Sequence, residues 1–280
     1  MSAKEASLHP LVACARGAET LRVWSVIVTI FGDAVAPRGG EISGPALAEL
    51  TAPLGIGGGA LRVALHRLVR DGWLERRREG RPSRYALSAR GLAEFAPAAA
   101  RIYAAGPAGE ENLTLWLAEP GLAAPRRAEL EREMAGRGAV ALGPGLWLEQ
   151  GANEAVSAEL FGFHGAAGTP PGWLRARLAP EELIAAYRAL GDDLEALGRR
   201  LERARPEGAL AAALRVLVVH RWRRCLLRHP DLPVRFFPED WPGEAVRAQF
   251  RALHRRLSVA ADPWLDALIG PALQPLRLSK

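Results

Sequence analysis

Cysteine and long apolar runs are scarce in this chain. Cys14 and Cys225 are its only two cysteines, and they form no metal-ligand spacing, so we assign them no role and expect a reducing compartment. No apolar run approaches the ~18 residues that span a bilayer, and residues 1–16 lack the apolar core of a secretory signal. We therefore expect a cytoplasmic protein with no membrane partner.

Motifs of catalysis are lacking as well. The sequence contains no Walker loop, no nucleophile elbow and no His/Cys cluster with metal-ligand spacing. Neither His164 nor His220 has an acidic or nucleophilic residue at motif spacing, so we interpret each as a core or surface histidine. The sequence therefore predicts a protein that is not an enzyme, with no catalytic residue, no metal and no cofactor.

The segment that follows Gly59 predicts a DNA-recognition helix joined to a β-wing. Apolar residues recur there at i, i+3, i+4 and i+7, which is the spacing of a helix face packed on a core. These residues are Leu61, Ala64, Leu65 and Leu68. Asp71-Gly72 ends the helix, and residues 73–78 and 84–87 predict two strands joined by a turn over residues 79–83.

The net charge of +6 is concentrated in the same segment. Residues 62–84 hold eight arginines against three acidic residues, an imbalance typical of a surface that meets a phosphate backbone. A solvated surface without a partner explains an arginine cluster equally well. The helix residues expected to read bases in the major groove are Arg62, Val63, His66, Arg67 and Arg70. The strand and turn residues expected to contact phosphates are Arg76, Arg77, Arg78, Arg81 and Arg84.

The other N-terminal elements are predicted to be mainly helical. Residues 21–31 are interpreted as a helix with Thr20 as its candidate N-cap, followed by a turn and a short strand and then by a helix over residues 45–54. The glycine-rich residues 55–59 form the turn into the recognition helix. Ser88 is predicted to cap a helix over residues 89–105, and residues 107–112 are interpreted as a domain boundary.

Beyond that boundary the pattern predicts a small α+β unit and then helices. The strands are expected over residues 113–117, 139–142, 146–149 and 157–163, and the one helix among them over residues 125–136. The C-terminal helices are expected over residues 181–205, 209–228, 244–257 and 263–269. The fold class predicted is thus α+β, mainly helical.

Three stretches of the chain carry a family resemblance. They read FGDAVAPRGGEI (residues 31–42), LRVALHRLVRDGWLERRREGRPSRYALSARG (residues 61–91) and VVHRWRRCLLRHPDLPVRFFPEDWPGEAVRAQF (residues 218–250). In content and order they resemble the PaaX-type transcriptional repressors of phenylacetic acid catabolism.

The resemblance implies three domains. They are an N-terminal winged helix-turn-helix DNA-binding domain (residues 1–106), a small central ferredoxin-like, Cas2-like domain (residues 107–178) and a helical C-terminal domain (residues 179–280). It also implies a homodimer on palindromic double-stranded DNA operators, released by the acyl-CoA effector phenylacetyl-CoA. Two departures from the family pattern are the short space for a second helix between Glu149 and Phe163 and the short segment after Leu257.

On this resemblance the helix over residues 209–228 is the candidate binding site for the effector. His220, Arg223 and Arg224 share one face by their spacing, and these arginines either hold CoA phosphates or pair with acids. The acids considered are Asp231, Glu239, Asp240 and Glu244. Trp222 and Trp241 either wall a pocket for an aromatic acyl group or pack in the core. The ligand-binding candidates are thus His220, Trp222, Arg223, Arg224 and Trp241.

Two alternatives to this function stay open from the sequence. The effector could be a different acyl-CoA or an unrelated aromatic compound. The Cas2 likeness also suggests a metal-dependent nuclease, whose chemistry needs carboxylates around a divalent ion. The first central strand offers only Glu119 for that purpose, so we rank the regulator above the nuclease.

Overall fold

The computed structural model of the chain describes residues 8–77, 82–106, 112–151, 154–166 and 168–273. Two compact units are formed, each from segments far apart in the sequence. The first unit comprises Met1–Ala105, Ala185–Leu226 and Pro242–Lys280, and the second comprises Gly106–Ile184 and Leu227–Trp241. The division into three domains at residues 106 and 178 stays a prediction.

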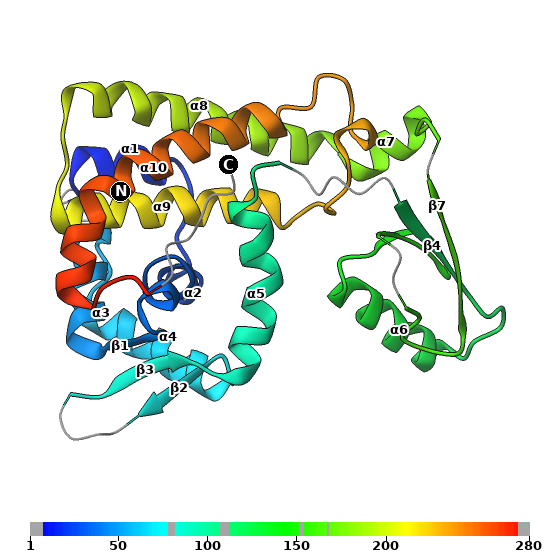
Figure 1. The fold of residues 1–280 in the computed structure, drawn as a ribbon, viewed down its shortest axis with the longest axis horizontal. Helices are drawn as coiled ribbons and strands as arrows, with labels where there is room; N and C mark the ends of the chain where they lie inside the picture. Colours follow the sequence, from blue (N-terminus) through cyan, green and yellow to red (C-terminus); the bar gives the residue numbers. More distant parts are fainter. Residues whose placement is uncertain (1–7, 78–81, 107–111, 152–153, 167, 274–280) are drawn as a thin grey trace. The chain divides into compact units, whose positions relative to one another are not determined.

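The first unit is built around helix α9 (Gly208–Leu226), whose residues from Ala211 to Trp222 are all buried. Figure 1 shows α9 in the middle of this unit, with α5 reaching it from the strands. Helices packed against α9 include α1 (Pro10–Arg16), α2 (Val23–Ile30), α3 (Gly44–Thr51), α5 (Ala89–Tyr103) and α10 (Gly243–Leu268). Both ends of the chain therefore contribute to one core.

The N-terminal elements place a helix beside a small sheet. After α2 the chain forms a π-helical turn, a 3-10 turn and a short strand, which are η2 (Phe31–Val35), η3 (Ala36–Arg38) and β1 (Glu41–Ser43). Helix α3 and the turn η4 (Ala52–Leu54) lead to α4 (Gly58–Arg70), then to β2 (Leu74–Arg77) and β3 (Arg84–Leu87). The three strands form an antiparallel sheet in the order β1-β3-β2. Helix α2 packs against α4, and α4 packs against β2.

Two glycines permit close turns in this region. Gly55 ends η4 with a φ of +72°, a left-handed conformation that costs glycine little. At Gly32 a Cβ would lie 2.1 Å from the Phe95 ring, so the π-helical turn can approach α5 only because residue 32 has no side chain.

Ser88 caps α5 as predicted, because its Oγ accepts a hydrogen bond of 2.9 Å from the Gly91 N–H.

Some element boundaries predicted from the sequence are wrong. The N-cap of α2 is Arg22, which makes no side-chain capping bond, rather than Thr20. The last two predicted helices are one helix, α10, with Pro263 inside it. Proline removes one backbone donor and disfavours a helix interior, but Ala261 and Leu265 on either side of it are buried, and their packing keeps the helix continuous. Helices α1 and α7 (Gly172–Leu178) were not predicted.

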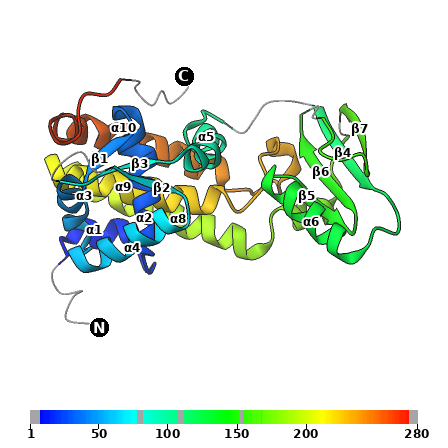
Figure 2. The ribbon, with the colours of Figure 1, turned by 90° about the horizontal axis from the view of Figure 1, so that it is seen from below.

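The second unit contains a four-stranded antiparallel sheet in the order β5-β6-β4-β7. Its strands are β4 (Asn112–Ala118), β5 (Val140–Gly143), β6 (Leu146–Gln150) and β7 (Leu160–Ala166), and α6 (Ala124–Gly136) connects β4 to β5. The described residues between β6 and β7 form no helix. The sheet thus has a β-α-β-β-β order along the chain (Figure 2).

Each face of this sheet has its own apolar cluster. On one face Trp116 and Trp147 pack with Leu130 and Met134 of α6. On the other face Leu113 and Leu148 pack with residues of α7 and of the turn η5 (Val234–Phe236). The sheet is therefore covered on one face by a helix from within its own sequence and on the other face by segments that follow its last strand.

A buried carboxylate joins the N-terminal turn of the first unit to three helices. Arg215 Nε donates a hydrogen bond of 2.8 Å to Asp33 Oδ2. Tyr103 Oη donates one of 2.8 Å to Asp33 Oδ1, and His254 Nε2 lies 3.1 Å from the same oxygen. Burial by itself raises the pKa of the Asp33 carboxyl, but Arg215 and the two hydrogen bonds outweigh it, so the pKa lies well below its usual range.

The network extends to the surface through α10. Asp262 Oδ1 accepts hydrogen bonds from Arg215 Nη1 at 2.5 Å and from Arg38 Nη2 at 2.9 Å. Arg38 also donates to Asp266 Oδ1 at 2.8 Å. The two guanidinium groups are buried, whereas Asp262 and Asp266 are about half exposed. The turn after α2 is thus tied to α10 by two buried cations.

We expect Asp33→Asn to lower the free energy of unfolding by about 3–5 kcal/mol, because it removes one partner of a buried ion pair and leaves Arg215 incompletely compensated. Asp266→Asn is the matched control. Its carboxylate is partly exposed and Arg38 keeps Asp262, so we expect a loss of less than about 1 kcal/mol. Urea unfolding of both variants measures these values. Equal losses in the two would contradict the central role assigned to Asp33.

Candidate nucleic-acid interface and ligand-binding residues

Helix α4 buries the face that the sequence predicted. Leu61, Ala64, Leu65 and Leu68 are all buried, which confirms the core stripe. The five residues predicted to read bases are exposed on the rest of the helix, and they are Arg62, Val63, His66, Arg67 and Arg70. Val63 exposes 73% of its surface. The helix therefore presents cationic side chains and one free apolar side chain to solvent.

An acidic residue at the end of α4 holds two of these arginines. Asp71 accepts hydrogen bonds from Arg70 at 3.0 Å and from Arg67 at 3.3 Å, and hydrogen bonding to Arg70 is the main reason why the pKa of the Asp71 carboxyl is lowered. The Arg67 guanidinium also lies 5.2 Å from the centre of the Trp24 ring, a cation–π distance. Both arginines remain more than half exposed.

The strand pair after α4 carries a second set of cations. Arg76 donates to Ser83 Oγ. Arg77 and Arg84 face one another across β2 and β3, and both contact Glu41 of β1, Arg77 at 3.3 Å. Two predicted phosphate contacts, Arg78 and Arg81, lie outside the described residues.

The cationic side chains of α4 and of the strand pair come from adjoining elements. Figure 1 shows β2 and β3 at the edge of the first unit that is remote from α8 (Glu181–Arg203), with α4 next to them. Six described arginines lie on α4 and the strand pair, and their acidic neighbours are three, Glu41, Asp71 and Glu75. The charge excess is thus reduced by internal pairing but stays positive.

The candidate ligand-binding residues occupy a different environment. Trp222 is fully buried, stacks on Phe250 with ring centres 5.2 Å apart, and donates from Nε1 to the Ile102 carbonyl at 3.0 Å. Trp241 belongs to the second unit, where it stacks on Phe237 at 4.7 Å. A ligand could reach Trp222 only after the core had opened.

The arginines of α9 find partners that the sequence did not indicate. Arg223 Nη2 donates to Ser25 Oγ at 2.8 Å, and Arg224 Nη1 donates to Glu19 Oε2 at 2.7 Å. None of the four acids considered from the sequence is the partner found here. The ligand-binding role of these residues stays a prediction.

His220 is a neutral histidine in the core. Its Nδ1 lies 3.0 Å from Thr29 Oγ1, and since Thr29 donates its own proton to the Ser25 carbonyl, the ring must donate. Burial, and then the like charges of Arg223 and Arg224, lower the pKa of His220 to about 3.

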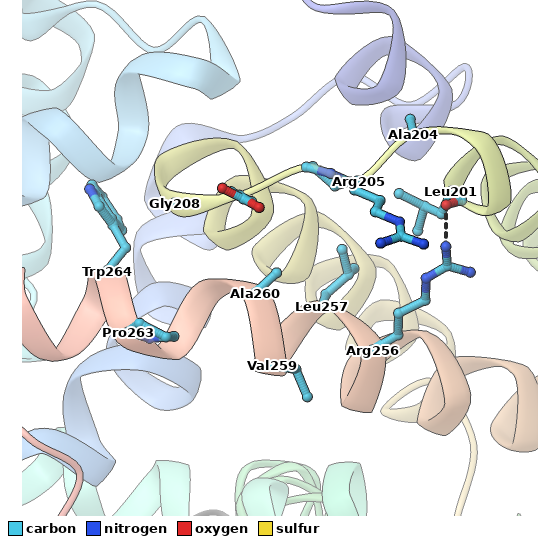
Figure 3. A pocket seen from close by; sticks show the side chains of 12 residues that line it. Leu201, Ala204, Arg205, Gly208, Arg256, Leu257, Val259, Ala260, Pro263 and Trp264 are labelled. Atoms are coloured by element: carbon cyan, nitrogen blue, oxygen red, sulfur yellow. Dashed lines mark hydrogen bonds between the residues drawn. The ribbon is translucent and has the colours of Figure 1, made fainter.

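Two cavities open in the first unit, away from most of the predicted residues. One of about 560 Å³ lies between the end of α8, the start of α9 and α10 (Figure 3). Another of about 460 Å³ borders Arg38, Arg215 and His254 of the buried network. Sequence reasoning missed both. The only local signal was the helix break Pro206-Glu207-Gly208, because the other lining residues come from separate helices.

The described residues contain no group of three His, Cys, Asp or Glu side chains placed to hold a metal ion. No helix within them combines the length and the apolar character needed to cross a membrane.

Comparison with known proteins identifies the family. The model of the PaaX-like protein matches residues 22–91, and that of the PaaX-like protein C-terminal domain matches residues 179–267. Transcriptional repressor PaaX of Escherichia coli (strain K12) is 30% identical over 260 residues, which cover 85% of this chain and 81% of that protein. The chain belongs to the PaaX family.

A solved structure supports the fold alone. The uncharacterized protein Rv0674 from Mycobacterium tuberculosis aligns with a TM-score of 0.53 at 23% identity, covering 89% of this chain and 99% of that chain. The similarity therefore extends along nearly the whole of the two chains.

The stability of the protein should depend on pH through His220. The folded pKa of about 3 lies below the unfolded value of about 6.5, so the contribution of the neutral ring is present above pH ~6.5 and is lost as the pH falls from there toward the folded pKa. We expect His220→Gln to make the fall in unfolding free energy shallower by up to about 1.4 kcal/mol per pH unit. Urea unfolding at several pH values measures the slope, and parallel profiles would contradict the burial of a neutral ring.

Proposed function

We propose that this chain is a transcriptional repressor that binds double-stranded DNA through α4 and the β2–β3 strand pair. The observation that carries the proposal is the exposed cationic face of α4, joined to a cationic strand pair on the same unit. The order α3, α4, β2, β3, with β1 completing the sheet, supports a winged helix-turn-helix in this proposal. The relative from Escherichia coli is named a transcriptional repressor, which supports the same conclusion.

The chemistry of the two elements suits different parts of the duplex. An α-helix fits the major groove, where arginine pairs with guanine O6 and N7 and an apolar side chain meets the thymine methyl. Arg62, Arg67 and Arg70 take the first role and Val63 takes the second. Arg76, Arg77 and Arg84 on the strands neutralise phosphates, which fix the register of the protein on DNA.

The acidic partners of these arginines are the groups that a phosphate replaces. Asp71 and Glu41 each hold two guanidinium groups in a surface otherwise suited to anions. When DNA binds, a phosphate oxygen takes the position of a carboxylate oxygen as hydrogen-bond acceptor. Each arginine then replaces a carboxylate partner with a phosphate partner, so it does not exchange a shell of water alone for the phosphate.

The proposal includes a homodimer on a palindromic operator, because one recognition helix contacts few base pairs and two half-sites together give more specificity. The second unit offers a surface for the partner copy. In β4 and β7, Leu115 pairs with Phe163 and Leu117 pairs with Phe161 on one face, and the two phenylalanines expose 65% and 67% of their surface. An aromatic side chain supplies ~150–250 Å², so two copies of this patch approach the ~1,000 Å² that a specific interface needs.

The strand order of the second unit supports a ferredoxin-like, Cas2-like fold. Numbered within the unit, the sheet has the order 2-3-1-4 with antiparallel neighbours, which is the split β-α-β arrangement. The second helix of a complete fold is reduced to a connection between β6 and β7. The four apolar side chains lie on the sheet face opposite α6, since they alternate along the strands with Trp116 and Leu160 of the α6 cluster.

The effector in this proposal is an aromatic acyl-CoA such as phenylacetyl-CoA, and the regulated genes are those of phenylacetate-type catabolism. The protein acts in the cytoplasm, where DNA and CoA thioesters occur together. A different acyl-CoA or an aromatic compound without CoA is the alternative effector.

Removal of Arg67 or Arg70 tests the DNA interface. On a duplex selected from a random library by the unmodified protein, we expect each arginine-to-alanine variant to bind more weakly by about 1–3 kcal/mol if the side chain reads a base. A phosphate contact instead lowers the salt slope by ~0.9. Arg199→Ala, which removes an exposed arginine of α8, is the control. Fluorescence anisotropy at several salt concentrations measures both quantities, and unchanged affinity and slope in Arg67→Ala and Arg70→Ala would refute the assignment of α4.

The effector is tested on the protein–DNA complex itself. Titration with phenylacetyl-CoA, phenylacetate and CoA should release the DNA with the thioester alone, since only that molecule carries the aromatic acyl group and the phosphates together. Release is followed by the fall in anisotropy. Release by all three compounds, or by none, contradicts a specific thioester effector while leaving the DNA-binding proposal intact.

A further inference from the structure

The cavity of about 560 Å³ at the turn between α8 and α9 has an apolar wall and a charged end. Leu257, Ala260, Pro263 and Trp264 of α10 line it along one side (Figure 3). Trp264 lies against the turn into α9, because a Cβ built on Gly208 would come within 3.5 Å of its ring. The volume of about 560 Å³ falls within the range of ~300–1,000 Å³ typical of small-molecule sites.

Two guanidinium groups mark the charged end. Figure 3 shows Arg205 and Arg256 pointing toward the same space, remote from Trp264. Arg256 donates to the Leu201 carbonyl, and within the described residues neither arginine has a carboxylate at ion-pair distance. Glu207 also lines the cavity. The local charge is therefore positive, with one carboxylate opposing two cations.

From this geometry we infer that the cavity binds an amphipathic anion, with its apolar or aromatic group against Trp264 and Pro263 and its carboxylate or phosphate at Arg205 and Arg256. Guanidinium groups bind both anions with charge-assisted hydrogen bonds, and an indole ring supplies a large apolar contact. The inference rests on the proposed function in one respect, since it makes this cavity the site of the effector.

A contact route leads from the cavity to the recognition helix. Asp262, next to Pro263 of the cavity wall, holds Arg38 and Arg215 on the other side of α10. Arg215 holds Asp33, in the turn that follows α2, and α2 packs against α4. A ligand that shifts this part of α10 acts on Asp262 and hence on the segment that positions α4.

Charge variants of the full-length protein test the site by isothermal titration calorimetry with phenylacetyl-CoA, phenylacetate and CoA as probes. We expect the double variant Arg205→Gln, Arg256→Gln to bind the thioester at least about tenfold more weakly, because it loses both charge-assisted bonds. Glu207→Gln should bind it more tightly, since a like charge is removed. Arg199→Gln, which removes a cation from α8 outside the cavity, should bind as the unmodified protein does. Phenylacetate binding without CoA binding identifies a carboxylate at the arginines, and the reverse identifies a phosphate.

A space-filling variant separates the cavity from charge effects. Ala260→Phe adds an aromatic ring inside the cavity without changing the charge, and we expect it to weaken binding about tenfold or more with unchanged affinity for DNA. Thermal unfolding of each variant verifies that it is folded. Binding at the unmodified affinity in both Ala260→Phe and the double arginine variant overturns the inference, and so does the absence of binding by all three probes.

The outcomes also separate this inference from the proposed function. If the thioester still releases DNA from both cavity variants as from the unmodified protein, the effector proposal stands and the site is wrong. If a probe binds in the cavity and the variants abolish that binding, but no probe releases DNA, the site stands and the effector role fails.

Discussion

The buried carboxylate of Asp33 is the interaction on which the first unit depends. An ionised group removed from water is very costly unless it is paired and hydrogen-bonded, so the fold must bring donors to it. They come from α5, α9 and α10, through Tyr103, Arg215 and His254. Since Asp33 directly follows α2, the N-terminal elements reach their stable arrangement only when the C-terminal helices are in place. This requirement explains why segments that are not consecutive in the sequence form one compact unit.

Local patterns predicted well the helix and strands that carry the candidate DNA interface. The four apolar positions of α4, the Ser88 cap and the strand pair depend on residues within a few positions of one another, and the structure confirms each of them. The end of α10 shows where such reasoning stops. Pro263 is a local signal to end a helix, but the burial of Ala261 and Leu265 in a helix that packs against α9 outweighs it. This packing cannot be read from the sequence alone.

The surroundings of the candidate effector-binding residues were less predictable from the sequence, for a related physical reason. The spacing of His220, Arg223 and Arg224 correctly places them near one another on α9, but it cannot say how much of that face is enclosed. Helix α9 is covered by helices from both ends of the chain, so His220 and Arg223 are enclosed and contact residues of α2, whereas Arg224 stays partly exposed beside Glu19. The cavity at the α8–α9 turn depends on three helices meeting, and its arginines are 51 residues apart in the sequence.

The acidic residues within the cationic surface bear on how such a surface could recognise DNA. A free arginine loses rotamer freedom when it is ordered by a partner, which costs up to ~2 kcal/mol. Asp71 holds Arg67 and Arg70, and Glu41 holds Arg77 and Arg84, so part of that cost is met before any phosphate arrives. The same carboxylates compete with the phosphate, and this competition limits nonspecific affinity. In the proposed complex, a surface in which four arginines are held by two carboxylates therefore favours a duplex whose phosphates lie where the carboxylates already hold the guanidinium groups.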